Sequence, residues 1–373
     1  MNIGVLTSSR ADYGIYLPLL EKLKKDSFFS LEIIAFGTHL SRKHGFTLSD
    51  IIKDEYNIIH EITSLSEDDS EKGIAISYAN TILSFSDFWS DQKFDLVFCL
   101  GDRFEMSAAV QASIPFGVKL AHLHGGEMTL GAIDDIYRHQ ITLASKYHFV
   151  ASDKFAKKVS EITGELKGIY NVGSLSLDGV KKIVLPDWGD VRKLFNIPKK
   201  EFILITFHPE TINPEQNRFH IEIIFESLIE LCEKYHLVIT LANADTMGSL
   251  FRESSRLLKS KKPMNITLIE NFGKYNYFSA MKASKILLGN TSSAILEAAS
   301  FGKYAINVGN RQLGRLRSNN VFDIPYDKAR IINVVNDIIK KGVYDGLNKY
   351  YKNNPSLNII KIIKKNELQK TLN

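Results

Sequence analysis

Short apolar runs alternate along the chain with longer stretches in which apolar side chains recur about every three or four positions. The short runs have the length of buried strands, and the longer stretches have the period of amphipathic helices. In the first half of the chain, the pattern predicts strands at residues 2–6, 31–36, 95–100, 118–122 and 147–150 and helices at residues 16–25, 105–114 and 134–145.

The alternation begins again with the run FILITF at residues 202–207. In the second half, the pattern predicts strands at residues 202–207, 237–241, 266–269, 286–288 and 304–308 and a helix at residues 221–235. A repeated strand–helix alternation is typical of a mostly parallel sheet with helices on both faces. The length of 373 residues exceeds the size at which single cores usually stop growing, so two such sheets are expected.

The fold class that we predict is therefore α/β, with two Rossmann-like doubly wound domains facing a cleft. We place the first domain at residues 1–173, the second at residues 174–355 and a last helix at residues 356–373. Ser356 is the expected N-cap of that helix. Ligands of such sheets bind beyond the carboxyl ends of the strands, so we expect the functional site in the cleft.

Charge and cysteine content narrow the class of protein. The formal net charge of +5 comes largely from lysines near the C-terminus, where a solvated helix face explains them, so no nucleic acid is expected as a partner. The sequence has two cysteines, Cys99 and Cys232, whose spacing is neither metal-like nor redox-like. So low a cysteine count is typical of proteins in a reducing compartment. No signal sequence opens the chain, and no run approaches the roughly eighteen apolar residues of a membrane span. We therefore expect a cytoplasmic protein without a membrane partner.

Two loops are suited to bind phosphate. TSSRADYG, residues 7–14, lies between a predicted strand and a helix, where backbone N–H groups and Arg10 can meet an anion. The alternative is a surface Arg10 that pairs with Asp12. The loop has no GxGxxG pattern, which argues against a dinucleotide cofactor.

The second such loop is GNTSSAILE, residues 289–297, at another predicted strand end. Thr291, Ser292 and Ser293 would offer hydroxyl and backbone N–H groups to a phosphate, and Glu297 could accept both hydroxyls of a ribose. The alternative is an ordinary capped helix with a surface glutamate.

An unusual group of ionisable residues follows two strands of the first half. In LGDRFE, Asp102 is either a catalytic carboxylate or an N-cap that forms a capping box with Glu105. In HLHGGE, His122 and His124 would share one face of an extended segment, with Glu127 close by. Two histidines and scattered carboxylates are a weak metal signal, so no metal is expected. The alternative to a functional pair is one histidine in the core and one on the surface.

Three more segments add candidates. DDIYRH opens a helix in which Asp134 suits the first turn and Arg138 lies about one turn later. His208, in TFHPET, follows the first strand of the second half and points into the cleft or is a plain loop histidine. Arg311 and Arg315, in VGNRQLGR, are phosphate or carboxylate contacts, or surface ion-pair residues. Two phosphate loops with an ionisable cluster between them indicate a nucleotide diphosphate with acid–base chemistry at its other end.

The set of motifs resembles the UDP-N-acetylglucosamine 2-epimerase family, in its hydrolysing branch that serves sialic-acid-type sugar synthesis. The matching segments, in order, are SSRADYG, LGDRFE, HGGE, DDIYRH, FHPET, NADT, GNTSS with Glu297, and GNRQLGR. The resemblance implies a two-domain, glycosyltransferase-B-like architecture with the nucleotide held mainly by the second domain. It also implies a last helix that crosses back to the first domain, a nucleotide-sugar substrate, no cofactor, and a homodimer or homotetramer.

The implied reaction is hydrolysis with inversion at C2 of UDP-N-acetylglucosamine. UDP leaves C1 as the C2 proton is removed, and water adds to the resulting 2-acetamidoglycal to give N-acetylmannosamine. The catalytic set carried over is Asp102, His124, Glu127, Asp134 and His208; the binding set is Arg10, Arg138, Asn243, Thr291, Ser292, Ser293, Glu297 and Arg311. Many members carry Glu where this chain has His124, so either His124 takes the acid–base role or Glu127 supplies the carboxylate.

Other functions fit the same motifs. The substrate could instead be UDP- or GDP-linked 2,4-diacetamido-2,4,6-trideoxyhexose (N,N'-diacetylbacillosamine), which feeds legionaminic acid. A glycosyltransferase of this architecture would need an acceptor site, and the first domain shows no clear one. The motifs RADYG and GDRFE favour the hydrolysing branch over a non-hydrolysing epimerase. A nucleotide-sugar sensor would have little use for so many proton carriers.

Overall fold

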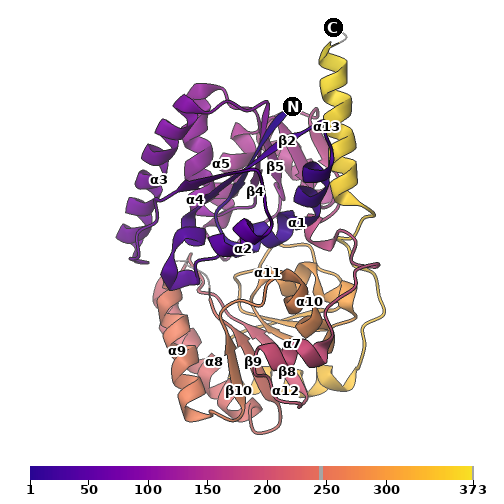
Figure 1. The fold of residues 1–373 in the computed structure, drawn as a ribbon. Coiled ribbons are helices and arrows are strands. Elements are labelled where there is room, and N and C mark those ends of the chain that lie inside the picture. Colours follow the sequence, from indigo (N-terminus) through magenta and orange to yellow (C-terminus); the bar gives the residue numbers. More distant parts are fainter. Residues whose placement is uncertain (243–246, 372–373) are drawn as a thin grey trace.

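The structure is a computed structural model that describes residues 1–242 and 247–371. Two parallel sheets fill its two halves, one above the other in Figure 1. Within the described residues, the first sheet has seven strands in the order β3-β2-β1-β4-β5-β6-β7, and the second has six in the order β10-β9-β8-β11-β12-β13.

The first half contains six helices among its described residues. The strands are β1 (Asn2–Thr7), β2 (Ser30–Phe36), β3 (Ile58–Ile62), β4 (Leu96–Leu100), β5 (Leu120–Leu123), β6 (Tyr147–Val150) and β7 (Ile169–Asn171). The helices are α1 (Arg10–Lys25), α2 (Leu48–Lys53), α3 (Glu71–Asp91), α4 (Phe104–Ser113), α5 (Asp134–Ala144) and α6 (Asp153–Thr163).

The second half repeats the alternation and ends in a long helix. The strands are β8 (Phe202–Thr206), β9 (His236–Thr240), β10 (Ile266–Ile269), β11 (Leu287–Gly289), β12 (Ala305–Val308) and β13 (Val321–Ile324). The helices are α7 (Trp188–Leu194), α8 (Asn217–Leu231), α9 (Gly248–Lys261), α10 (Lys274–Ala283), α11 (Ser292–Leu296), α12 (Lys328–Lys340) and α13 (Pro355–Thr371).

Both sheets follow one topology. Numbered from its own first strand, each begins in the order 3-2-1-4-5-6, so the strand order reverses between β1 and β4 and again between β8 and β11. Separate apolar clusters cover the two faces of each sheet, as expected when helices pack on both sides. The predicted fold class of two Rossmann-like doubly wound α/β units is confirmed.

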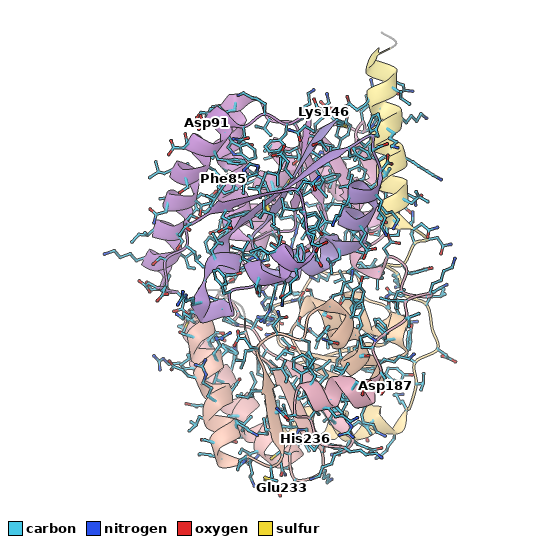
Figure 2. All side chains as sticks on the ribbon, viewed as in Figure 1. Phe85, Asp91, Lys146, Asp187, Glu233 and His236 are labelled. Atoms are coloured by element: carbon cyan, nitrogen blue, oxygen red, sulfur yellow. The ribbon has the colours of Figure 1, made fainter. Side chains whose placement is uncertain are left out.

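The strands of both sheets end at the boundary between the halves. Lys146, just before β6, lies at the outer pole of the first half, and His236, the first residue of β9, lies near the outer pole of the second (Figure 2). The carboxyl ends of the strands therefore face one another across the boundary, where a ligand is expected.

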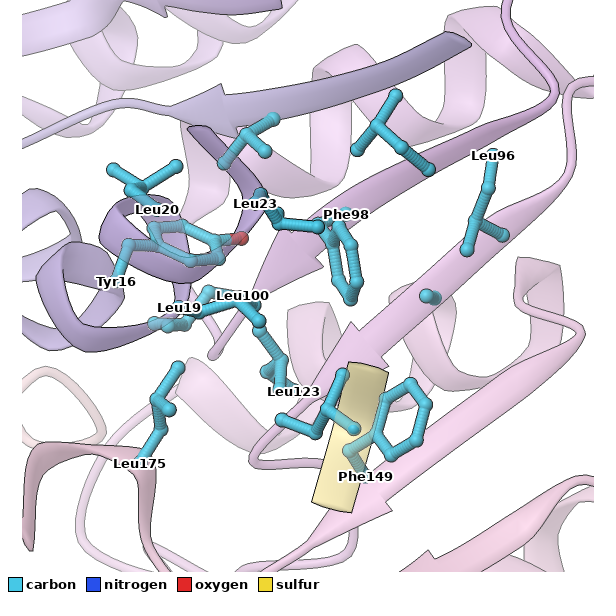
Figure 3. Close-up of a cluster of buried hydrophobic side chains, with 14 of the residues drawn as sticks. Tyr16, Leu19, Leu20, Leu23, Leu96, Phe98, Leu100, Leu123, Phe149 and Leu175 are labelled. Atoms are coloured by element: carbon cyan, nitrogen blue, oxygen red, sulfur yellow. The ribbon is translucent and has the colours of Figure 1, made fainter. Parts of the chain in front are cut away.

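Helix α1 shows how an apolar stripe builds the core. Tyr16, Leu19, Leu20 and Leu23 have the spacing of one helix face, and Figure 3 shows them beside Phe98 and its neighbours on the sheet. The helix begins at Arg10, earlier than the predicted residue 16, because the Ser9 side chain caps it by accepting a hydrogen bond from the N–H of Asp12.

The last helix does not begin as predicted. Pro355 is the first residue of α13, and Ser356 lies inside its first turn rather than at the N-cap. The reason is a buried acceptor: Ser356 donates to Asp178 Oδ2 from both its hydroxyl and its backbone N–H, the latter at 3.2 Å. The helix then packs beside α1 in the first half (Figure 1), where Ile359 and Ile363 join the core.

No helix among the described residues is both long enough and apolar enough to span a lipid bilayer.

We expect Ser356→Ala to lower the stability of the protein by about 1.5–3 kcal/mol, because the buried Asp178 carboxylate loses a donor. The midpoint of urea unfolding measures the change. Asn358→Ala is the matched control, since it removes only an exposed hydrogen bond of the same helix. An unfolding midpoint equal to that of the wild type in Ser356→Ala would contradict this role.

Candidate active site

A cavity of about 350 Å³ lies between the carboxyl ends of the two sheets, within the size range of small-molecule sites. Four strands flank the two points of order reversal, and each is followed by a residue that lines the cavity. Arg10 follows β1, Asp102 follows β4, His208 follows β8 and Thr291 follows β11. The cavity therefore occupies the position where sheets of this topology bind ligands.

The structure brings nearly all predicted site residues to this one cavity. Asn243 lies outside the described residues. The other twelve all line the cavity: Arg10, Asp102, His124, Glu127, Asp134, Arg138, His208, Thr291, Ser292, Ser293, Glu297 and Arg311.

Arg138, on α5, is the centre of the charged cluster in the first half. Its side chain is buried and forms ion pairs with Asp102 and Asp135, and its Nη1 donates to the carbonyl oxygen of Glu127 at 2.7 Å. Two carboxylates raise its pKa above the ordinary value despite burial, so it stays charged. Because the guanidinium is occupied on both sides, Arg138 holds the carboxylates in place.

Asp102 and Glu127 are ionised near neutral pH. Burial alone would raise the pKa of Asp102, but the charges of Arg138 and Arg315 outweigh it and hold the pKa below the ordinary value. Burial likewise raises the pKa of Glu127, but Arg315 and His124 lower it by more, so the pKa lies below the ordinary value. The first half thus presents fixed negative charge to the cavity.

Asp102 is not the N-cap of α4. That position belongs to Arg103, whose side chain makes no capping bond. Glu105 accepts from Arg103 Nη2 at 2.8 Å instead of closing a capping box. The capping alternative is therefore wrong, because Asp102 is already bound to Arg138.

The two histidines of HLHGGE separate. Strand β5 ends at Leu123, and His124 has a φ of 65°, which turns the chain and breaks the alternation that would have placed both rings on one face. His122 stays in the core, with Nε2 2.9 Å from Gly101 O and Nδ1 3.1 Å from Thr142 Oγ1. Burial lowers the pKa of His122 to about 3, so it is a neutral structural residue.

His124 instead faces the cavity from a strained backbone position. Its Nδ1 lies 2.9 Å from Glu127 Oε1, and its Nε2 is buried without a hydrogen-bond partner in the described structure. The other oxygen of Glu127 is bound by Arg315. Both oxygens of Glu127 are thus occupied, and Nε2 of His124 remains available to a ligand. His124 is 8 % exposed, so the surface alternative is wrong.

The hydroxyl-rich turn of the second half leads into a short helix. Helix α11 spans only Ser292–Leu296, and Glu297 comes just after it. Glu297 accepts a hydrogen bond from the Ser293 hydroxyl, and burial raises its pKa above the ordinary value. It is a cavity residue, not a surface glutamate.

Hydrogen bonds and an ion pair between loops hold His208 and Arg311 at the cavity. The backbone N–H of His208 donates to Asn290 Oδ1 at 2.7 Å, and Asn290 Nδ2 donates back to the His208 carbonyl at 2.8 Å. Arg311 Nη2 lies 3.7 Å from Asp134 Oδ2. The second half thus reaches across the cavity to the carboxylates of the first.

Arg10 also joins the two halves. It does not pair with Asp12, which accepts from the hydroxyl and N–H of Ser8. Arg10 donates to the carbonyl oxygen of Glu270, which follows β10, and lies 3.7 Å from its Oε1. The alternative of a surface pair with Asp12 is therefore wrong.

Sequence reasoning missed several residues that line the cavity, among them Arg103, Glu270, Lys274 and Tyr277. Arg103 lies within LGDRFE but was not chosen as a site residue, and the other three lie outside every motif that the pattern singled out. The one available signal is position, since Glu270 comes directly after a predicted strand and its sheet edge was expected to face the cleft.

These observations define a two-domain α/β protein of the glycosyltransferase-B-like class, with the cavity between the domains. Comparison with known proteins narrows the class. The sequence model of the family described as UDP-N-acetylglucosamine 2-epimerase matches residues 21–364, so the chain belongs to that family.

The chain is similar to other proteins along most of its length. A GDP/UDP-N,N'-diacetylbacillosamine 2-epimerase (hydrolyzing) of Campylobacter jejuni is 36% identical over 322 residues, which cover 86% of this chain and 83% of the relative. Polysialic acid biosynthesis protein P7 of Escherichia coli is 29% identical over 363 residues, covering 96% and 92%. The fold matches that of the UDP-GlcNAc 2-epimerase from Neisseria meningitidis bound to UDP-GlcNAc, with a TM-score of 0.79, 18% identity and coverage of 98% and 100%.

We expect Arg138→Met to destabilise the protein by about 3–5 kcal/mol near neutral pH, because buried carboxylates lose their partner. In the wild type, the lowered pKa values of Asp102 and Glu127 contribute stability at neutral pH that is lost as the pH falls through them. The variant should therefore lose less stability than the wild type as the pH falls from about 7 to about 3.

Urea unfolding at both pH values measures the difference. Arg218→Met, at an exposed position of α8, serves as the control. An Arg138→Met protein whose stability matches the wild type at neutral pH would refute the role of Arg138 as holder of the cluster.

Proposed function

We propose that the protein is a hydrolysing 2-epimerase that converts UDP-N-acetylglucosamine into N-acetylmannosamine and UDP through a 2-acetamidoglycal. The observation that carries the proposal is a single cavity with fixed carboxylates on one side and a hydroxyl-rich turn with Glu297 on the other. In this proposal residues 1–173 hold the sugar and residues 174–355 hold the nucleotide. The bound UDP-GlcNAc of the Neisseria structure and the hydrolysing activity named for the Campylobacter relative support it.

The nucleotide end is assigned to the second half. Backbone N–H and hydroxyl groups at residues 291–293 are suited to the phosphates, and Glu297 to the ribose hydroxyls. His208 and Arg10 would meet the departing diphosphate. Arg10, which binds Glu270 in the described structure, would exchange that partner for a phosphate oxygen.

The sugar end is assigned to the ionised edge of the first half. Departure of UDP breaks the C1–O bond, and the bonding electrons leave with the phosphate oxygen. Positive charge builds at C1, where Asp102 and Asp134 can stabilise it. Loss of the C2 proton then forms the C1–C2 double bond. Water adds to C1, and a proton returns to C2 on the opposite face.

The geometry favours His124 as the group that moves the C2 proton. Glu127 fixes the ring through Nδ1 and is itself held by Arg315, and the lowered pKa of its carboxyl group makes it a weaker base. Nε2 of His124 has no partner in the described structure and lies at the cavity. We therefore assign the acid–base role to His124 and an orienting role to Glu127.

A second substrate is favoured by one specific observation. The Campylobacter relative is named for N,N'-diacetylbacillosamine linked to GDP or UDP, at 36% identity. The same chemistry at C1 and C2 would serve that sugar, which differs at C4 and C6. The alternative function is therefore hydrolysis of that nucleotide sugar with inversion at C2.

Incubation of the protein with UDP-N-acetylglucosamine in deuterated water, followed by proton NMR, tests the reaction. We expect free UDP and N-acetylmannosamine with deuterium at C2, because the departing proton exchanges with solvent. If the protein binds UDP but does not turn over UDP-N-acetylglucosamine, the assignment shifts to the diacetamido sugar nucleotide, which is tested in the same way. If neither nucleotide sugar is turned over, the proposed function is contradicted.

Asp102→Asn and Asp134→Asn should each lower kcat by about 100-fold or more, because neutral amides stabilise positive charge poorly. Circular dichroism should show an intact fold in both. Asp87→Asn, at an exposed position on α3 outside the cavity, is the matched control and should retain wild-type kcat. Wild-type activity in both cavity variants would overturn the assignment.

His124→Gln should lower kcat by about 100-fold or more while UDP affinity stays near that of the wild type, because the ring acts at the sugar end. His124→Glu should retain more activity than His124→Gln, since a carboxylate can also carry a proton. If Glu127 acts directly instead, His124→Gln will keep its turnover and Glu127→Gln alone will lose it.

A further inference from the structure

Lys274 is a cavity residue that the proposed reaction does not use. It is the first residue of α10, in the second half, and it lines the cavity. The residue as a whole is half-buried, but its Nζ atom is buried and has no hydrogen-bond partner among the described residues. A buried donor without an acceptor is costly, so such groups usually have a ligand or water to bind.

The first half closes over this lysine. A Cβ atom built on Gly14 of α1 would lie 3.7 Å from the Cβ of Lys274. The start of α10 therefore packs against α1 across the boundary between the halves. This contact encloses the lysine side chain between the two halves at the cavity.

The charges around Lys274 place it at the nucleotide end. Among the carboxylates, Glu297, just after α11, stabilises the ammonium charge most, followed by Asp178 and by Glu21 of α1. Lys22 of α1 repels that charge. These carboxylates do not compensate for burial, which lowers the pKa of Lys274 to about 8. Of the carboxylates, the proposed ribose ligand Glu297 thus acts most strongly on the ammonium, and both residues line the cavity.

We propose that Lys274 is a nucleotide-binding residue whose ammonium donates to an acceptor oxygen of the bound nucleoside diphosphate. The inference rests on the proposed function, which places a nucleotide in this half of the cavity. An ammonium has three donors and no acceptor. Phosphate oxygens and base carbonyls are acceptors that a nucleotide would bring beside Glu297, so both sources of that oxygen are tested below.

Nucleotide binding should then draw a proton from solvent. Near pH 8 roughly half of the lysines are neutral, and an acceptor oxygen favours the charged form, so about half a proton is taken up per nucleotide bound. At about pH 6.5 the lysine is already charged and the uptake from this group vanishes. Burial raises the pKa of Glu297, but this residue is present in every variant compared below, so the difference in uptake between variants reports on the lysine.

Isothermal titration of UDP at about pH 8, in two buffers of different ionisation enthalpy, measures the proton uptake. We expect Lys274→Met to lose the uptake and to bind UDP about tenfold more weakly or worse, because a charged hydrogen bond is lost. Lys274→Arg should bind UDP without uptake, since the guanidinium does not titrate there. Lys282→Met, exposed on the same helix, should behave as the wild type.

Titration with uridine separates the two sources of the acceptor oxygen. Proton uptake with uridine assigns the contact to the base, and uptake with UDP alone assigns it to a phosphate. Wild-type affinity and uptake in Lys274→Met, or wild-type uptake in a folded Lys274→Arg, would overturn the inference and leave the proposed function standing. A wild-type protein that does not bind UDP would contradict the proposed function and this inference with it.

Discussion

The buried guanidinium of Arg138 is the interaction on which the site depends. It reaches from α5 to Asp102 beyond β4 and also binds the Glu127 carbonyl, so it ties two strand ends of the first sheet together. Burial alone would favour neutral carboxyls at this edge, and Arg138 offsets it together with Arg315. Asp102 and Glu127 therefore remain charged at the cavity. That fixed charge is what suits the edge to a developing cation on a sugar.

The second sheet completes the site from the opposite direction. Because both sheets reverse their strand order and end their strands at one boundary, loops of unrelated sequence meet there. Arg315 binds Glu127, Arg311 pairs with Asp134, and Arg10 binds Glu270, so several ion pairs bridge the halves. A ligand that spans the cavity would therefore contact both halves, and its binding is coupled to their relative position.

Much of this could be predicted from the sequence, because strands here are short apolar runs: all ten predicted strands are present within two residues of their predicted ends. Helix α3 escaped notice because Ser77 and Thr81 occupy its buried face and weaken the apolar period. The described site residues were found through motifs at strand ends. The separation of His122 from His124 depends on one positive φ, and the role of Lys274 depends on burial; neither is encoded in a local pattern.

The central claim is that this cavity breaks the bond between C1 of the sugar and the nucleotide, with water entering at C1. Hydrolysis of UDP-N-acetylglucosamine in ¹⁸O-labelled water, with mass spectrometry of both products, tests it most directly. The account predicts that the label appears in N-acetylmannosamine and not in UDP. Label in the terminal phosphate of UDP would mean that a phosphorus–oxygen bond breaks instead, and would contradict the roles given to both halves of the site.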